Sequence, residues 1–250
     1  MQITKLFYKP QKGKPLINAN SLTLTTGYGI HNDIHAQWGS PRQVLIVSQS
    51  TLDDFHLQAG DLGENIVVNA DIEAYQSGQV LKFGKDVLIR LMFHCEPCKN
   101  LEQVQTGLMK KIKIRRGFLG FVIEGGEIKK NDQVTVTPYQ FPCLTDQFKP
   151  RFAEFIDRIP DGKLVNTTDL LLALGVSKAY YRSIPILIKK AKSSLPTYKL
   201  VKKDGSLFTK YIPNQPELLR QQGIVINNEK VNYPNYAWEY QQYHQIKLGG

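Results

Sequence analysis

The chain has 250 residues, of which 42% are hydrophobic and 22% charged, and its formal net charge is +10. This composition is that of a soluble globular protein. Three cysteines are too few for a disulfide framework, and no apolar run approaches the roughly 20 residues that span a bilayer. The first residues also lack the apolar segment of a signal peptide. We therefore expect a cytoplasmic protein with no membrane partner.

The positive charge is unevenly distributed along the chain. Residues 1–150 contain 17 basic and 14 acidic residues, whereas residues 151–250 contain 15 and 8. An excess of this kind favours an anionic partner for the C-terminal part, and nucleic acid is the first candidate. A basic surface that is merely solvated fits the charge equally well.

The first 137 residues are typical of a succession of short strands, rich in Val, Ile, Leu and Thr and bounded by Gly, Asn and Asp. Phe83–Asp86 and Glu124–Glu127 predict hairpin turns. A helix is predicted over Gln49–Phe55, where Ser50 or Thr51 can cap it. So many short strands predict an all-β barrel or sandwich. The predicted strands are Gln2–Tyr8, Ser21–Thr25, Gln43–Ser48, Asn65–Val68, Gln79–Phe83, Asp86–Phe93, Leu119–Ile123 and Gln133–Thr137.

A linker is predicted over residues 139–150, which contain two prolines and no clear period. The apolar spacing then becomes helical, with Phe152, Phe155, Ile156 and Ile159 at positions i, i+3, i+4 and i+7. Beyond them, Asn166, Thr167 or Thr168 can cap a helix that stops at Gly175.

A third helical stretch, Lys178–Lys192, contains Pro185, which should kink or split it. Two helices joined by a tight turn form the helix-turn-helix pattern. Tyr198–Lys202 and Ser206–Lys210 predict a hairpin, or wing, and Leu218–Gln222 predicts a last short helix. The second part is therefore predicted to be a mainly α, winged helix-turn-helix domain.

The tail, residues 232–250, contains four tyrosines and one tryptophan. Such a segment is too aromatic for a disordered tail, so it predicts packing across a domain face. Stacking on nucleic acid is the alternative.

The candidate reactive residue is Cys98, which follows the apolar run Val87–Leu91 in a segment that also holds His94, Cys95 and Glu96. Side chains placed just past the end of a buried strand are well situated to form a site. Three alternatives exist. Cys95 and Cys98 could be half of a zinc site completed by Cys143 and His94, they could be a redox pair, or both could be structural thiols.

Seven separated stretches agree in order and spacing with one family: Gly29–His35, Arg42–Ile46, Gly60–Ile66, Pro97–Cys98, Arg116–Phe118, Gly125–Ile128 and Asn131–Val134. They resemble the MOSC family, the domain named after the C-terminal part of molybdenum cofactor sulfurases. Gly60–Ile66 matches its Gly-Glu-Asn segment and Pro97-Cys98 its signature cysteine, whereas Asn32 stands where a second Gly is usual.

The MOSC resemblance implies a β-barrel-like domain over residues 1–138. It also implies that Cys98 either ligates molybdenum through the pterin cofactor or carries sulfur as a persulfide, and a soft thiolate suits both roles. No pyridoxal phosphate is expected, because nothing resembles the separate domain that binds it. Gly-Glu-Asn could equally be structural. Residues that could line the cofactor cleft are Asp33, His35, Arg42, Glu64, Asn65 and Arg116.

Residues 151–231 contain Ile159–Lys163, Leu174-Gly175, Arg182–Ile184, Val201–Leu207 and Leu218–Ile224. These stretches resemble the C-terminal DNA-binding domain of O6-alkylguanine-DNA alkyltransferases and of their alkyltransferase-like relatives. The family's active segment reads Pro-Cys-His-Arg, but here it is Pro196-Thr197-Tyr198-Lys199. Because the thiolate and its activating imidazole are both absent, alkyl transfer is not expected.

The resemblance still implies duplex DNA binding through basic side chains, although this domain could equally have become a packing module. The predicted phosphate contacts are Lys178, Arg182, Lys189, Lys190, Lys199 and Lys202. Two hypotheses follow. The protein is a molybdenum-cofactor oxidoreductase or a sulfur-transfer protein served by an electron or sulfur donor protein, or it is a non-catalytic DNA-binding protein.

Overall fold

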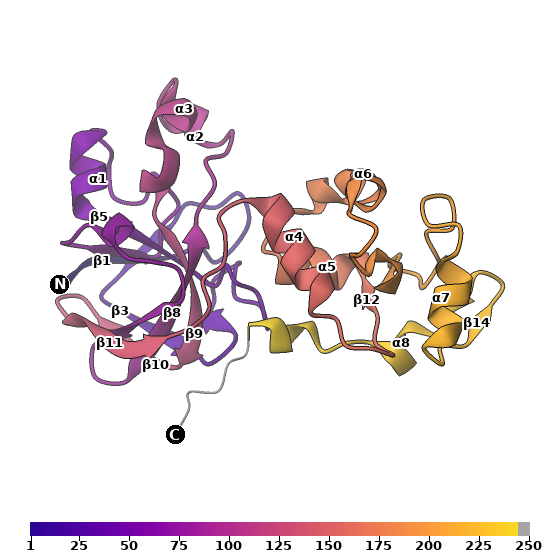
Figure 1. Ribbon diagram of the computed structural model, residues 1–250. Coiled ribbons are helices and arrows are strands. Elements are labelled where there is room, and N and C mark those ends of the chain that lie inside the picture. Colours follow the sequence, from indigo (N-terminus) through magenta and orange to yellow (C-terminus); the bar gives the residue numbers. More distant parts are fainter. Residues whose placement is uncertain (245–250) are drawn as a thin grey trace. The chain divides into compact units, whose positions relative to one another are not determined.

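The computed structural model describes residues 1–244, which divide into two compact units at Asp146 and Gln147 (Figure 1). The first unit, residues 1–146, is mostly β-structure, and the second unit, residues 147–244, is mainly helical.

The first unit is built on an eight-stranded sheet with strand order β11-β7-β8-β9-β5-β6-β1-β2 and a three-stranded sheet with order β10-β3-β4. The strands are β1 (Ile3–Tyr8), β2 (Ile17–Ala19), β3 (Ser21–Thr25), β4 (Gly29–Ile30), β5 (Val44–Ser48), β6 (Ile66–Val68), β7 (Gln79–Phe83), β8 (Val87–His94), β9 (Phe118–Glu124), β10 (Gly126–Lys129) and β11 (Val134–Gln140).

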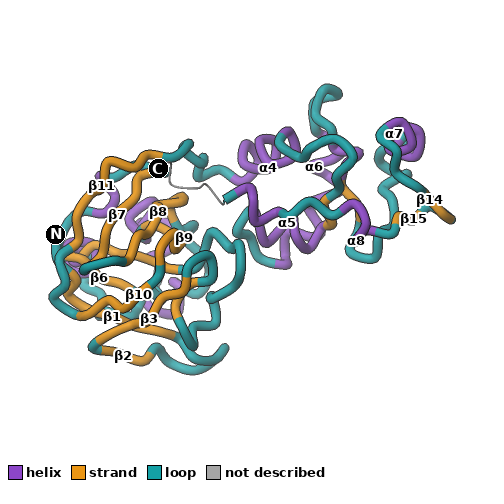
Figure 2. Tube along the Cα trace, turned by 90° about the horizontal axis from the view of Figure 1, so that it is seen from below, coloured by secondary structure: helices purple, strands orange, loops and turns teal. Residues whose placement is uncertain are grey.

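The larger sheet curls back on itself. Val134 N donates to Met1 O at 2.7 Å and Ile3 N donates to Asp132 O at 3.0 Å, so the start of β1 meets the chain that enters β11. The two sheets enclose one apolar core (Figure 2) to which both contribute, including Ile46 and Ile89 from the larger sheet and Ile128 from the smaller. Burial of this apolar surface is the main force that holds the unit together.

The predicted strands are confirmed in place, and so is the helix α1 (Gln49–Asp54). The prediction of an all-β domain is incomplete, because a helical segment connects β8 to β9. It consists of α2 (Leu101–Val104), α3 (Leu108–Ile112) and the 3-10 helix η2 (Lys113–Arg116), and a further 3-10 turn, η1, spans Ile72–Ala74. These helices are too short for a helical period to emerge from the sequence.

Of the two predicted hairpins, the one at Phe83–Asp86 is confirmed, since β7 pairs with β8 in register Phe83↔Val87. The hairpin predicted at Glu124–Glu127 is wrong. After β9 the chain leaves the larger sheet, and β10 pairs with β3. Gly125 makes this change of sheet possible, because a Cβ there would lie 2.5 Å from Leu24 O.

The second unit contains α4 (Phe148–Asp157), β12 (Val165–Asn166), α5 (Thr167–Ala173), η3 (Lys178–Ser183), α6 (Ile184–Lys190), η4 (Thr197–Lys199), β13 (Leu200–Val201), α7 (Gln215–Gln221), β14 (Ile226–Asn227), β15 (Lys230–Val231), α8 (Tyr233–Tyr236) and η5 (Tyr240–Tyr243). The strands pair as β12 with β13 in parallel and β14 with β15 in antiparallel orientation.

Local sequence signals explain the boundaries of these helices. The Asn166 side chain accepts from Thr168 N and Asp169 N and so caps α5, and Gly175 adopts φ 64° just after the helix. Pro185 divides the predicted third helix into η3 and α6 and lies in the first turn of α6, where its missing N–H costs nothing.

The wing predicted at residues 198–210 is not a two-stranded hairpin. Lys202 N donates to Ser206 O at 2.8 Å, which closes the expected turn. The returning segment instead meets the chain next to β15, since Leu207 N donates to Glu229 O and Ser206 forms a bridge with Lys230. The sequence cannot show this pairing because the two segments are more than 20 residues apart.

The described part of the aromatic tail packs within the second unit. Trp238 is buried, with its ring centroid 5.3 Å from that of Phe155, and the Tyr243 ring lies 4.9 Å from the same phenylalanine. The rest of the predicted tail, residues 245–250, lies outside the described residues. None of the helices within residues 1–244 has the length and hydropathy of a membrane span.

Candidate functional site

The cysteine segment lies between the end of β8 and the start of α2. Cys95 is buried, and its backbone N–H donates to Gly117 O at 2.8 Å. Gly117 has φ 98°, and a Cβ there would lie 2.2 Å from Ile46 O, so only glycine allows this close approach. The carbonyl oxygen of Cys98 accepts from Leu101 N at 3.0 Å, which sets Cys98 at the base of α2 with its side chain half-buried.

Two arginines bring positive charge to this segment. Arg42 Nη2 lies 3.8 Å from Cys95 Sγ, and an Arg116 guanidinium nitrogen donates to the carbonyl oxygen of Glu96. Arg116 Nε is buried and has no hydrogen-bond partner among the described residues. A buried N–H without a partner costs about 1–3 kcal/mol, so this atom is suited to an acceptor that binds from outside the chain.

His35 belongs to the same charged region. Partial removal of its imidazole from water lowers its pKa, and the positive charges of Arg42, Lys9 and Arg116 lower it further, while the Asp33 carboxylate opposes them. The net direction is downward, so His35 is a neutral imidazole at pH 7. The predicted cofactor residues His35, Arg42 and Arg116 are therefore electrostatic neighbours.

The other three predicted cofactor residues have structural contacts, and two of them, Asp33 and Asn65, form a clasp. Asn65 Oδ1 accepts from Leu45 N, and Asn65 Nδ2 donates to Phe7 O and to Asp33 Oδ2. The Asp33 carboxylate also accepts the backbone N–H groups of Lys9 and His35. These contacts favour the structural interpretation of the Gly-Glu-Asn segment over the lining of a cleft.

Glu64 is fully buried, and its carboxylate accepts the backbone N–H groups of Gly60 and Leu62. Burial raises the pKa of Glu64, and the two backbone donors offset that effect only in part. The carboxylate thus fixes the turn at Gly60–Glu64 that leads into β6.

Gln43 is a residue whose importance the sequence does not reveal. It has no exposed surface, its Nε2 donates to Gly27 O and Gln37 O, and its Oε1 accepts from Val122 N. The amide therefore fastens the loop that carries His35 to β9. The only signal in the sequence is a glutamine placed directly before the apolar run of β5.

Residues 141–146, predicted as part of the linker, form a strap along β8. Arg90 Nη2 donates to Pro142 O at 2.9 Å, and its guanidinium lies 5.2 Å from the centroid of the Phe141 ring. At the end of the strap, the Asp146 carboxylate accepts two hydrogen bonds, from His94 N at 2.8 Å and from His94 Nδ1 at 2.9 Å. The end of the strap is therefore held at His94, the residue before Cys95.

The zinc alternative finds no support in the structure. Within residues 1–244, no three His, Cys, Asp or Glu side chains are grouped so that they could hold a metal ion. Cys143 is exposed, and its thiol donates to Ser77 O at 3.1 Å.

The basic side chains of the second unit line two hollows on either side of Pro185. One, of about 520 Å³, is lined by Arg182, Pro185, Ile186, Lys189, Lys190 and Tyr211, without a carboxylate. The other, of about 490 Å³, is lined by Thr167, Tyr181, Ile184, Pro185, Lys202, Lys203, Asp204 and Phe208. Four of the predicted phosphate contacts therefore lie on one surface, and Lys178 is exposed on the neighbouring η3.

The prediction for Lys199 needs correction. Its side chain is only 5% exposed, and Nζ donates to Ile159 O and Asp161 Oδ1, both at 2.8 Å. The ammonium group therefore fixes the turn that follows α4, and it is not available to contact a phosphate. Thr197, which the sequence places where the alkyltransferase resemblance expects a reactive cysteine, is buried as well.

Residues 33–135 match the family model of the MOSC domain. Among solved structures, the chain is similar to the YuaD protein from Bacillus subtilis, with 16% identity, a TM-score of 0.49 and coverage of 56% of this chain and 96% of the other. It is also similar to YiiM from Escherichia coli, with 19% identity, a TM-score of 0.45 and coverage of 73% and 90%.

A third similar structure is that of Atl1 from S. pombe in complex with damaged DNA containing O6-carboxymethylguanine. Identity is 20%, the TM-score is 0.35, and the match covers 38% of this chain and 98% of the other. A comparison with curated proteins gives no match. The family match spans the part of the chain that carries His35, the Gly-Glu-Asn segment and Cys98, so residues 33–135 of this chain are similar to a MOSC domain.

Proposed function

We propose that the first unit binds a molybdenum–pterin cofactor and that Cys98 is the protein ligand of the metal. The observation that supports this most directly is the set of groups around the cysteine segment. A half-buried thiol, two guanidinium groups and an unpartnered buried Arg116 Nε occur together. A soft sulfur ligand and cationic donors fit a thiophilic metal held by an anionic, phosphate-bearing pterin.

The chain's own residues have distinct parts in this proposal. Cys98 supplies the thiolate, Arg42 and Arg116 hold the anionic part of the pterin, and neutral His35 can accept a proton beside them. Asp33 and Asn65 act indirectly, by fixing the loops that carry these groups. When bound, the cofactor would supply two-electron redox chemistry, which makes the protein an oxidoreductase.

Replacing Cys98 by serine is expected to lower the molybdenum content of protein purified from cells with an intact cofactor pathway by at least about tenfold, because a hydroxyl is a poor ligand for this metal. Molybdenum is measured by elemental analysis and the pterin by its fluorescence after release. The matched control is Cys143→Ser, which changes an exposed thiol outside the charged region.

Unchanged molybdenum in the Cys98→Ser protein would rule out the ligand role. A persulfide assay on the same proteins then tests the alternative, in which Cys98 carries sulfur. A persulfide on the wild type and on Cys143→Ser, but not on Cys98→Ser, supports the carrier role.

A second function is supported by the two basic hollows beside Pro185. We propose that the second unit binds duplex DNA through the surface that carries Arg182, Lys189, Lys190 and Lys202. Lysines contact phosphates and do little to read bases, so binding should depend weakly on sequence. Tyr211 and Ile186, which line the first hollow with the cations, add apolar contact.

Duplex DNA should bind the full chain with an affinity that falls steeply as salt rises. Replacing Arg182, Lys189 and Lys190 together by glutamine is expected to lower the affinity about tenfold or more and to flatten the salt dependence, because fewer counterions are released. Gel-shift titrations across salt measure both quantities. Lys199→Met is the control, since its ammonium is turned inward. Absence of binding at low salt, or an equal slope in all three proteins, would contradict the proposal.

A further inference from the structure

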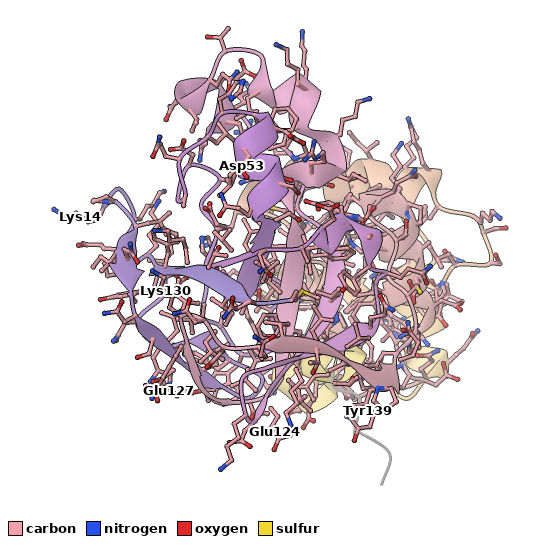
Figure 3. The ribbon with its side chains drawn as sticks, turned by 90° about the vertical axis from the view of Figure 1, so that its left-hand side faces the viewer. Lys14, Asp53, Glu124, Glu127, Lys130 and Tyr139 are labelled. Carbon is pink, nitrogen blue, oxygen red and sulfur yellow. The ribbon has the colours of Figure 1, made fainter. Side chains whose placement is uncertain are left out.

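The segment between β8 and β9, residues 99–116, concentrates the positive charge of the first unit. We call this segment the excursion. It contains six basic residues and one acidic residue, whereas the remainder of residues 1–146 contains 10 basic and 13 acidic residues. Figures 1 and 3 show α2 and α3 standing out from the sheet at the same end of the unit as α1. The first unit therefore has one strongly cationic projection on a slightly acidic body.

Internal contacts use the acidic residue and the two arginines but leave the lysines unengaged. The Glu102 carboxylate accepts from Gly107 N and Met109 N, at 2.8 and 3.1 Å, and so caps the turn into α3. Arg115 pairs with Asp54. Within residues 1–244, no carboxylate lies within ion-pair distance of the four exposed lysines, Lys99, Lys110, Lys111 and Lys113.

Exposed aliphatic side chains accompany these lysines. Val104 is 38% exposed and Ile114 is 51% exposed. Lys113 adopts φ 49°, a conformation that favours glycine, at the turn from α3 into η2. Holding a lysine in such a conformation costs about 1–3 kcal/mol.

The combination of lysines and aliphatic groups distinguishes between anionic partners. A nucleic acid backbone offers phosphates but little that packs on Val104 or Ile114. A protein surface offers carboxylates and apolar groups together, and transient interfaces are built in this way. Two aliphatic side chains are also too few to anchor a helix in a lipid surface.

We propose that the excursion is the docking surface for the acidic face of a partner protein that reaches Cys98. The excursion begins at the residue after Cys98 and returns to the same loop, where Arg116 holds the Glu96 carbonyl oxygen. A protein bound there lies next to the thiol. What the partner delivers rests on the proposed function of Cys98, but the docking itself does not.

The test compares three triple variants of the full chain, each of which removes three positive charges. The first is Lys110→Gln with Lys111→Gln and Lys113→Gln, in the excursion. The second replaces three exposed lysines, Lys12, Lys14 and Lys130, in the same way. Lys14 and Lys130 lie below the excursion in Figure 3. The third changes Arg182, Lys189 and Lys190 in the second unit.

Each protein is titrated at low salt with a plant-type ferredoxin, which is a small acidic electron carrier, with a 20-base-pair duplex, and with phosphatidylserine vesicles. The excursion triple is expected to weaken ferredoxin binding about tenfold or more while leaving DNA binding within twofold of the wild type. The other two triples should leave ferredoxin binding within twofold. Zero-length carboxyl–amine cross-links should map to the excursion lysines.

Three results would overturn the proposal. They are the absence of ferredoxin binding by the wild type at low salt, an equal loss in all three triples, and a loss in the excursion triple that affects only DNA or vesicles. Cys98→Ser should bind ferredoxin as the wild type does. Failure of docking is thus separated from failure of the cofactor proposal, which is judged by molybdenum content alone.

Discussion

Replacing Asn65 by alanine is expected to lower the free energy of unfolding of the first unit by about 3–4 kcal/mol. The substitution leaves Leu45 N and Phe7 O without their side-chain partner and removes one donor from the Asp33 carboxylate. Each buried polar group that loses its partner costs about 1–3 kcal/mol. Urea unfolding followed by circular dichroism measures the change.

The control for this prediction is Asn69→Ala, which truncates an asparagine side chain at an exposed position. Among residues 1–244, Asn69 Oδ1 accepts only Gln2 N, and the expected loss is below about 1 kcal/mol because water can replace the contact. Asn65→Asp should be as damaging as alanine, since it places a second carboxylate against Asp33. A loss of less than about 1 kcal/mol at Asn65 would contradict the clasp.

Replacing Gln215 by alanine is expected to destabilise the second unit by about 3 kcal/mol. Gln215 has no exposed surface, its Oε1 accepts from Phe208 N, and its Nε2 donates to Tyr198 O and Leu200 O. One amide therefore joins α7 to the segments on both sides of β13. Without it, three buried backbone groups lose their partners.

Tryptophan fluorescence can isolate this effect. Trp238 is buried in the second unit and Trp38 is 57% exposed in the first, so a Trp38→Phe background reports on the second unit alone. Gln221→Ala, at an exposed position of the same helix, should stay within about 0.5 kcal/mol of the parent protein. Equal transitions for the two variants would show that the Gln215 contacts contribute little.

The sequence predicted the elements that depend on local pattern. Strands such as β7 and β8, the turn between them, the Asn166 cap and the interruption at Pro185 all follow from neighbouring residues. The position of Cys98 just past a buried strand was also predictable, because the apolar run of β8 ends at the residues before it; its role as a ligand stays a prediction.

What the sequence could not predict depends on residues far apart in the chain. In the sequence Lys199 is one more lysine of a basic segment, but in the structure its ammonium group donates to Ile159 O and Asp161 Oδ1, about 40 residues earlier in the chain. Gln43 and Gln215 are likewise ordinary polar residues in the sequence, and only the fold surrounds their amides with backbone partners. The Gly-Glu-Asn segment carries the resemblance to the MOSC family, but its structural contacts became visible only around Asn65.

The strap along β8 has a mechanical consequence. The Asp146 carboxylate is hydrogen-bonded to His94, and the second unit begins at Gln147. A force applied to the second unit would therefore act first on the His94–Asp146 hydrogen bonds, one residue from Cys95. The covalent path from the second unit through Gln147 thus enters the first unit next to the segment that carries Cys95 and Cys98. A chain shortened to residue 138 would lose that path together with the Phe141 and Pro142 contacts that cover Arg90.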